Sequence, residues 1–422
     1  EFFRKLPVRY CGFIDIARQE SMETLDALAD TLRPDQRLVA AGCWSQREPE
    51  YLLDAVPRID AVLGTRSWGE IVSVAESVLS MPAEGSLTIV EDRLAMMPET
   101  VGVPGYVISG RSAFLKIADG CSRECAFCAI PAIKGSTVSR TMDAILHDAR
   151  ALQDYGVLEI NLIAQDSTFY GHDLGMRDGL AKLLTQLVYA VPDVPWIRVL
   201  YAYPGFVTPR LIEAMQRYPQ ILPYVDIPLQ HAHPDVLRRM RRPADMNGVR
   251  RTLARLREAL PEVALRTTLI VGFPGETDEE FQTLLDFVEE IRFDRLGVFA
   301  YSHEPGTAAA EMEDDVPPDV KAARYDRIMI AQQAISEARN QTFIGQRLPV
   351  LLEGTGDDLT VGRSYRDAPE IDGLILIPGE TAAHRLVEVE ITEALPYDLV
   401  GHIVGERARR SSSGADAADD VQ

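Results

Sequence analysis

Three cysteines lie close together in the chain, at Cys121, Cys125 and Cys128, in the segment CSRECAFC. Three thiolates at this spacing can bind three irons of a 4Fe-4S cluster and leave the fourth iron open to a small molecule, whereas ordinary electron carriers use four cysteine ligands. The alternatives are three buried structural cysteines or a zinc site that lacks one ligand. The spacing and the aromatic Phe127 before the last cysteine favour the cluster.

Six short apolar runs, each followed by a helical stretch, fill the middle of the chain. This alternation predicts an α/β fold with a parallel sheet, either open or curled into a partial TIM-like barrel with helices outside. Enzymes of that architecture carry their chemistry at the C-terminal ends of the strands. The cysteine segment begins just past the first run, so we expect it at that edge. The runs are residues 114–118, 158–164, 196–201, 224–228, 265–271 and 296–300.

The segments on either side of this array have sequence patterns that differ from its own. The first hundred residues have their own alternation of helical and apolar stretches, whereas a long helix near residues 319–344 is followed by short strands with Gly and Asp turns. We therefore expect a small N-terminal α/β domain at 1–100, the βα barrel at 107–340, a small antiparallel β-barrel at 343–407 and a disordered tail at 408–422.

Composition places the chain among soluble globular proteins, with 46% hydrophobic and 25% charged residues. No stretch approaches the roughly 18 apolar residues of a membrane span, and no signal-peptide pattern is present, so we expect a cytoplasmic protein without membrane contact. Five cysteines, an odd number without a secretion signal, argue against a disulfide framework. Metal or redox chemistry is the better interpretation.

Four further motifs accompany the cysteine segment: CGFI at 11–14, NLIAQD at 161–166, DIPLQH at 226–231 and VGFPGET at 271–277. Together with CxxxCxxC after the first of six βα units, they resemble the methylthiotransferases of the radical S-adenosylmethionine superfamily. The resemblance covers the chain up to about residue 407. It implies an N-terminal methylthiotransferase domain, a radical barrel and a C-terminal β-barrel called TRAM.

The resemblance also implies a reaction. The open iron would bind S-adenosylmethionine, and an electron from a flavodoxin-type donor would cleave that cofactor to give a 5′-deoxyadenosyl radical. The radical would take hydrogen from an unactivated carbon. An auxiliary 4Fe-4S cluster would then supply sulfur, and a second S-adenosylmethionine would supply the methyl group.

Several side chains at strand ends are implied as cofactor contacts. Segment 272–277 has a second interpretation, because Thr277 and Glu280 form a T-x-x-E capping box at the start of a helix. A histidine at 231 or 233 is equally compatible with a hydrogen-bonded place in the core or in a loop. The implied cofactor-binding residues are Phe127, Gln165, Gln230, His231, Arg266, Gly272 and Gly275.

Cys11 and Cys43 match two of the three cysteines that bind the auxiliary cluster in this family. The third is expected upstream in a Gly-Cys segment that has no counterpart here. We therefore expect an N-terminus shortened at its start and an auxiliary site that lacks one ligand as the sequence stands. Buried core cysteines are the alternative for both positions.

The charge of the chain indicates which kind of macromolecule it can bind. The net charge is −21, and residues 345–405 hold four Arg and eleven acids, a net of −7. Such a module should repel nucleic acid and attract a cationic protein, with acids such as Glu370 and Asp372 facing it. Within the family this favours the branch that modifies the β-carbon of an aspartate in the twelfth small-subunit ribosomal protein.

Two other functions stay open at this point. A transfer-RNA adenosine methylthiotransferase is the alternative within the family, and it requires the few Arg of the C-terminal module to gather on one side. A non-catalytic iron-sulfur or zinc-binding adaptor is the alternative outside it, and it predicts no cleavage of S-adenosylmethionine.

Overall fold

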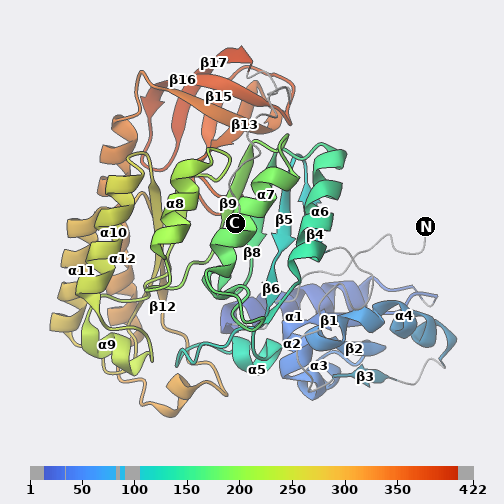
Figure 1. Ribbon diagram of the computed structural model, residues 1–422. Helices are drawn as coiled ribbons and strands as arrows, with labels where there is room; N and C mark the ends of the chain where they lie inside the picture. The colour runs from blue at the N-terminus through green and yellow to red at the C-terminus, as the bar shows by residue number, and fades with distance from the viewer. Residues whose placement is uncertain (1–13, 34, 82–85, 91–104, 407–422) are drawn as a thin grey trace.

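The computed structural model describes residues 14–33, 35–81, 86–90 and 105–406, which form three parts (Figure 1). An N-terminal part lies at the lower right, a βα array fills the centre, and a β-barrel lies at the top. This arrangement confirms the predicted fold class. The tail expected to be disordered, 408–422, is outside the described residues. Among the described helices, none is both long enough and apolar enough to cross a bilayer.

The N-terminal part is a three-stranded parallel sheet with helices around it, in the order β1-β2-β3. Apolar residues of β1 and of the inner strand β2, such as Ala40 and Val62, are fully buried. The sheet therefore has a core of its own. Its elements are α1 (Asp15–Asp30), β1 (Val39–Gly42), α2 (Cys43–Arg47), α3 (Pro49–Ala55), β2 (Ala61–Gly64), the 3-10 helix η1 (Thr65–Glu70), α4 (Ile71–Ser80) and β3 (Leu87–Ile89).

Six parallel strands form the central array, and each coincides with one of the predicted apolar runs. Strands β5, β8 and β9 pair in one sheet and β10, β11 and β12 in another. A single parallel bridge between Ile197 and Ile221 connects the two sheets. The strands are β5 (Ser112–Lys116), β8 (Glu159–Ile163), β9 (Trp196–Val199), β10 (Tyr224–Asp226), β11 (Ala264–Val271) and β12 (Arg295–Ala300).

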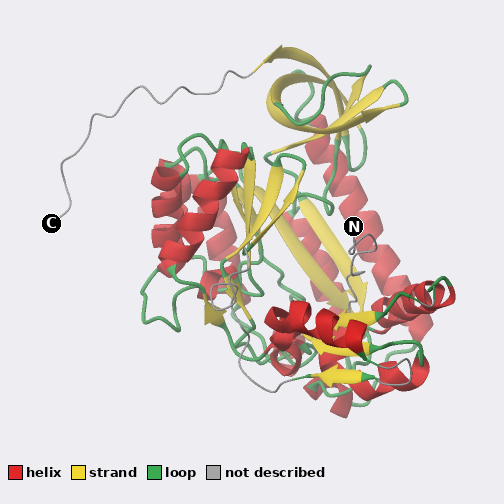
Figure 2. Ribbon diagram, turned by 90° about the vertical axis from the view of Figure 1, so that its right-hand side faces the viewer, coloured by secondary structure: helices red, strands yellow, loops and turns green. Residues whose placement is uncertain are grey.

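Helices cover the outside of this array (Figure 2). Several begin at a side chain that accepts a backbone N–H, as Thr141 does for α6 and Asp245 for α10. Their inward stripes bury residues such as Leu183 and Leu187 completely, and burial of each such side chain contributes about 1.5–3 kcal/mol. The helices are α6 (Met142–Tyr155), α7 (Gly179–Ala190), α8 (Pro209–Arg217), α10 (Met246–Ala259), α11 (Asp278–Ile291) and α12 (Pro318–Gln341).

Smaller elements sit at the rim of the array and between its units. One was not predicted: strand β4 (Tyr106–Ser109) pairs antiparallel with β5 and forms a hairpin at the edge of the sheet. The others are β6 (Ala118–Asp119), α5 (Ile130–Lys134), β7 (Val138–Ser139), the 3-10 helices η3 (Ser167–Phe169) and η4 (Ala308–Glu311), and α9 (Pro234–Arg239).

The C-terminal part is a closed five-stranded barrel in the order β13-β14-β15-β17-β16. Its pairings are antiparallel apart from a short parallel contact between β15 and β17. Strand β14 was not predicted as a strand, because its residues TVGRS offer no apolar alternation. The strands are β13 (Arg347–Gly356), β14 (Leu359–Ser364), β15 (Ile375–Pro378), β16 (Leu386–Ala394) and β17 (Leu399–Glu406).

The C-terminal barrel rests on the ends of the central strands where those strands begin, and the N-terminal part lies toward their other end (Figure 1). Buried ion pairs fill the contact. Glu159, the first residue of β8, accepts hydrogen bonds from Arg198 at 3.0 Å and from Arg363 of β14 at 2.6 Å, and the Ser112 hydroxyl donates to it at 2.8 Å. The side chains of Glu159 and Arg198 are wholly buried and that of Arg363 nearly so.

A second set of ion pairs lies beside the first. Asp367 accepts from Arg295, the first residue of β12, at 3.1 Å, and Asp372 accepts from the Tyr224 hydroxyl at 2.7 Å and from Arg266 at 3.3 Å. A buried charge is tolerated only when it is paired and hydrogen-bonded. These pairs therefore fix how the C-terminal barrel sits on the central one.

Replacing Glu159 with Gln should leave Arg198 and Arg363 buried without a counter-charge. We expect the free energy of unfolding to fall by about 3–5 kcal/mol, the usual cost of removing one partner of a buried ion pair. Glu290→Gln is the matched control, because Glu290 is 48% exposed in its pair with Arg250, and it should change stability by less than about 1 kcal/mol. Urea unfolding of both variants measures the difference, and equal losses would contradict the prediction.

The same pair should make stability depend on pH. Burial favours the neutral form of Glu159, but Arg198 and Arg363 outweigh it and lower the pKa from 4.5 to about 2. Because the folded pKa lies below the unfolded one, the stabilisation is complete above pH 4.5 and is lost as the pH falls toward 2. The stability gap between wild type and Glu159→Gln should narrow over that window. A gap that stays constant would show that Glu159 does not titrate on unfolding.

Candidate functional site

The cysteine loop follows β5 and β6 at the end of the barrel where the strands finish, as predicted. Backbone hydrogen bonds hold it to distant parts of the chain. The Ala126 amide donates to the Met240 carbonyl at 2.9 Å, and the Ala126 carbonyl accepts from the Ala309 amide at 2.7 Å. The Cys121 amide donates to the Gly135 carbonyl at 3.0 Å. The loop is thus fixed without being a helix or a strand.

The three thiols lie within electrostatic reach of one another, since each of Cys121 and Cys128 has its pKa raised in part by a neighbouring cysteine. Burial is the larger cause, and the pKa of Cys128 rises to about 12. Such thiols stay protonated until a metal binds, because a bound cation reverses the preference and takes the thiolate form. The donor set suits a thiolate-ligated cluster and does not suit a nucleophilic cysteine.

Arg123, inside the cysteine segment, ties the loop to the barrel rim. It donates to Asp166 at 2.8 Å, just past the end of β8. Its guanidinium carbon also lies 4.0 to 4.9 Å from the ring centres of Phe169, Tyr203 and Phe206. An ion pair inside an aromatic cage restrains the loop more than either contact alone.

Two predicted cofactor residues carry buried oxygens that have no hydrogen-bond partner among the described atoms: Oε1 of Gln165 and Oε1 of Gln230. A buried polar atom normally finds a partner, so each marks a place where a bound molecule would complete the bonding. Gln230 and the neighbouring strand-end residue Tyr201 have positive φ values, 73° and 61°, a costly conformation concentrated at functional sites. The residues present therefore fit a cluster with a polar cofactor beside it.

Phe127 and His231 are less directly placed than the resemblance implies. Phe127 packs, half-buried, against an apolar cluster that includes Phe273. His231 is fully buried: its Nδ1 accepts the His233 amide at 3.0 Å, and its Nε2 lies 3.3 Å from Glu276. Burial lowers the pKa of His231 despite Glu276. Its Nε2 has no hydrogen-bond partner among the described atoms, so the contact of His231 with the cofactor stays a prediction beside the core-histidine alternative.

Arg266 belongs to the other end of the barrel. Its guanidinium donates to Asp226 at 3.0 Å and to Asp372 of the C-terminal barrel at 3.3 Å. Both carboxylates hold it in the layer where the two barrels meet. Asp372 comes from the C-terminal barrel, whereas Asp226 is the last residue of β10. The contact of Arg266 with the cofactor stays a prediction.

The glycines of segment 272–277 serve the turn itself. Gly272 has a φ of 69°, and a Cβ there would collide with the Lys321 side chain at 2.3 Å. The Gly275 amide donates to Asp315 at 2.6 Å. The capping box of Thr277 and Glu280 at the start of α11 is present as predicted. These contacts give the segment a structural role, and its approach to a ligand stays a prediction.

Cys43 begins α2 directly after β1, and α2 packs against α5, the helix that follows Cys128. Arg66 strengthens this contact by donating to the carbonyls of Ala132 at 2.6 Å and Ile133 at 2.9 Å. The segment of Cys43 therefore adjoins the cysteine loop. Cys11 lies outside the described residues.

A second link joins the N-terminal part to the central barrel. Arg18 and Arg47 both pair with Glu304, at 2.6 and 3.3 Å, and the Glu304 side chain is only 3% exposed. Two cations on one buried carboxylate hold the N-terminal sheet in place at the cysteine end of the barrel.

The expected role of the C-terminal acids needs correction. That module lies at the end of the barrel away from the cysteines, so its charge does not face the cysteine loop (Figure 1). Asp372 is 3% exposed and fully engaged in the barrel contact, so it is no surface acid. Arg363 and Arg366 are also buried. Their burial leaves two of the four Arg, Arg347 and Arg385, to gather on a surface.

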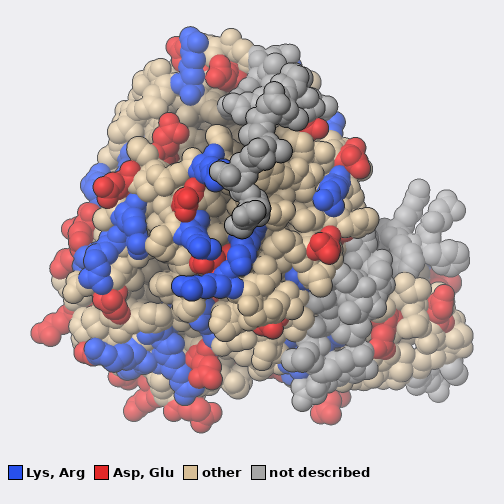
Figure 3. All heavy atoms as spheres, in the orientation of Figure 1, with Lys and Arg blue, Asp and Glu red and all other residues tan. Residues whose placement is uncertain are grey.

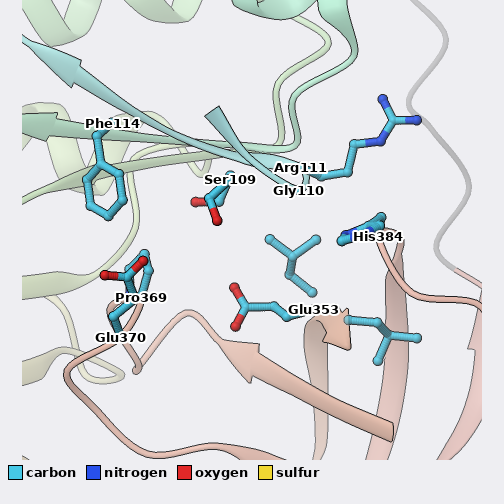
Figure 4. A pocket seen from close by; sticks show the side chains of 11 residues that line it. Ser109, Gly110, Arg111, Phe114, Glu353, Pro369, Glu370 and His384 are labelled. Atoms are coloured by element: carbon cyan, nitrogen blue, oxygen red, sulfur yellow. The ribbon is translucent and has the colours of Figure 1, made fainter. Parts of the chain in front are cut away.

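A cavity of about 130 Å³ lies where the β4–β5 hairpin meets the C-terminal barrel, lined among others by Arg111, Glu353 and His384 (Figure 4). It contains none of the predicted site residues. On the face drawn in Figure 3, Lys and Arg are interspersed with Asp and Glu, without a continuous basic patch.

Residues that sequence reasoning missed surround Cys125. Arg242 donates to its Sγ at 3.4 Å, and the Tyr203 hydroxyl lies close to the same cysteine. Tyr203 follows β9 and Arg242 follows α9. Arg123 lies between two cysteines in the sequence and could be noticed there. Nothing in the spacing of Arg242 and Tyr203 along the chain indicates that they contact Cys125.

Comparisons with known proteins agree with this geometry. Residues 115–288 match the radical SAM superfamily, 344–404 the TRAM domain and 7–64 an uncharacterized protein family, UPF0004. The chain is 46% identical to the ribosomal protein uS12 methylthiotransferase RimO of Roseiflexus sp. (strain RS-1), covering 96% of this chain and 91% of that protein. It is 42% identical to the RimO of Microcystis aeruginosa, covering 94% and 90%.

Among solved structures, the chain resembles the radical S-adenosylmethionine methyltransferase TsrM from Kitasatospora setae. The TM-score is 0.51 at 14% identity, over 81% of this chain and 63% of that one. This likeness concerns the fold alone. The identity to the RimO proteins over nearly the whole chain shows more: the chain belongs to their family, the radical SAM methylthiotransferases.

Proposed function

We propose that this enzyme adds a methylthio group to the β-carbon of an aspartate in ribosomal protein uS12, with two 4Fe-4S clusters and two molecules of S-adenosylmethionine. The observation that carries the proposal is the loop of Cys121, Cys125 and Cys128 at the barrel rim, together with the unpaired buried oxygens of Gln165 and Gln230. The names of the RimO relatives support the substrate. A substrate on the ribosome would place the enzyme in the cytoplasm.

In this proposal, the residues of the chain bind the cluster and orient the cofactor beside it. Cys121, Cys125 and Cys128 would hold the radical cluster, which when bound with S-adenosylmethionine supplies one-electron chemistry that acid and base side chains cannot provide. Arg123 and Asp166 keep the loop in place. Gln165 and Gln230 would direct their free oxygens at the polar groups of the cofactor. A flavodoxin-type protein is the proposed electron donor.

Cys43, with Cys11, would hold the auxiliary cluster that supplies sulfur. The packing of α2 on α5 supports this, because it brings the Cys43 segment beside the loop that ends at Cys128. A group transferred between the two sites would then travel a short way within one protein.

The negative charge of the N-terminal part supports a cationic protein substrate. The acidic residues concerned differ from those of the C-terminal barrel that the sequence suggested. Residues 14–81, at the cysteine end of the barrel, contain six Arg and twelve acids, a net of −6. Three of those Arg, at 18, 47 and 66, are committed to the contact with the central barrel. An acidic surface here favours a basic protein loop over a phosphate backbone.

Replacing Cys121, Cys125 and Cys128 with Ala should abolish reductive cleavage of S-adenosylmethionine, because no other described cysteine lies in this loop. The measurement is 5′-deoxyadenosine formed after anaerobic reconstitution with iron and sulfide. Cleavage retained by the triple variant would refute the assignment, whereas absence of cleavage by the parent protein would favour a non-catalytic adaptor.

Replacing Cys43 with Ala, or Arg66 with Ala, should separate the two half-reactions. Cleavage of the cofactor should persist, whereas methylthiolation should be lost in Cys43→Ala and fall at least about tenfold in Arg66→Ala, since a hydrogen bond from a charged group contributes about 1.5–3 kcal/mol. Arg58→Ala, at an exposed arginine of the same part, is the control. Loss of cleavage in Cys43→Ala would contradict the division of labour.

The substrate is tested by mass spectrometry with uS12 and transfer RNA presented side by side to the reconstituted enzyme. We expect the methylthio mark on uS12 alone, with a rate that falls as salt screens the acidic surface over about 8 Å. A mark on transfer RNA and none on uS12 would promote the adenosine-modifying alternative.

A further inference from the structure

Cys125 differs from the other two cysteines of the loop in what surrounds its sulfur. The backbone at Arg123 and at Ile130 lowers the pKa of Cys121 and of Cys128 against the larger effect of burial. Two side chains lie against Cys125 instead: Arg242 donates through Nη1 at 3.4 Å, and the Tyr203 hydroxyl lies close to the same thiol. Among the described residues, Arg242 is the cation that donates a hydrogen bond to a thiol of the loop.

Arg242 is held in this position by the rest of the fold. Its Nη2 donates to the Pro228 carbonyl, its backbone amide donates to the Leu237 carbonyl at 2.8 Å, and the residue is only 9% exposed. The preceding residue, Arg241, has a φ of 54°, which turns the chain sharply after α9. The Met240 carbonyl also accepts the Ala126 amide, so the Arg242 segment and the cysteine loop are joined at two neighbouring points.

Tyr203 links this pair to the rest of the rim. The guanidinium carbons of Arg242 and Arg123 lie 4.6 and 4.2 Å from the centre of its ring. Two cations against one ring draw electron density from the phenol and make its hydroxyl a better donor. The ring therefore holds Arg242 in place, and its hydroxyl lies close to Cys125.

We propose that Arg242 and Tyr203 are positioning residues that set the reduction potential of the radical cluster through the sulfur of Cys125. The inference rests on the proposed function, because it assumes that Cys125 ligates a 4Fe-4S cluster. A reduced cluster carries one more negative charge than an oxidised one, so a nearby cation and a hydrogen bond to the ligand sulfur stabilise the reduced form more. The pair raises the potential and makes the first electron easier to accept.

The test is a redox titration followed by electron paramagnetic resonance, in full-length chain carrying Cys11→Ala and Cys43→Ala so that a single cluster is observed. Arg242→Gln should shift the midpoint potential to more negative values. Tyr203→Phe should shift it less, because a neutral donor is weaker than a charged one. Arg242→Lys, which keeps the charge, should fall between Arg242→Gln and the parent.

Arg238→Gln is the matched control, since Arg238 lies on α9 four residues before Arg242, pairs with Asp235 and is 65% exposed. It should keep the parent potential. If Arg242→Gln loses the cluster, Tyr203→Phe and Arg242→Lys still decide the question. Parent-like potentials in every Arg242 and Tyr203 variant that holds the cluster overturn the inference, whereas a parent protein without a 4Fe-4S signal overturns the proposed function itself.

Discussion

The hydrogen bonds at Ala126 are the constraint on which the site depends. The loop that carries Cys121, Cys125 and Cys128 is neither a helix nor a strand, so its shape has to be imposed by contacts with other segments. The carbonyl of Met240 and the amide of Ala309, more than a hundred residues away in sequence, bond to the two sides of Ala126. Arg123 adds an ion pair with Asp166. The shape of the loop is therefore held by segments that the fold of the central array brings to it.

The two ends of the central barrel use buried polar groups in opposite ways. Where the strands begin, Glu159 and its arginines satisfy one another, and that end is closed by the C-terminal barrel. Where the strands finish, Gln165 and Gln230 keep oxygens that no described atom satisfies. A fully paired network specifies one arrangement of domains, whereas unpaired buried atoms store a capacity to bind. The ion pairs that stabilise the domain contact therefore lie at one end of the strands, and the unpaired side chains of the candidate site lie at the other.

The N-terminal part is attached by the same kind of contact that closes the opposite end. Arg66 bonds to carbonyls of α5, and Arg18 and Arg47 share Glu304. The contacts of Arg66 fall on α5, the helix that directly follows Cys128, so they join the N-terminal part to the cysteine loop. It also consumes half of the arginines in residues 14–81 and leaves that end of the molecule acidic.

The sequence by itself determined the six βα units, the cysteine loop after the first of them, the capping box at Thr277 and the C-terminal barrel, since each depends on local spacing and hydrophobic periodicity. Only the tertiary structure decided that His231 is buried, that Asp372 and Arg266 pair between the barrels, and that Arg242 and Tyr203 meet at Cys125. These last depend on which distant segments are brought within about 3 Å of one another. No spacing along the chain encodes that, because the contacts form only once the strands have assembled side by side.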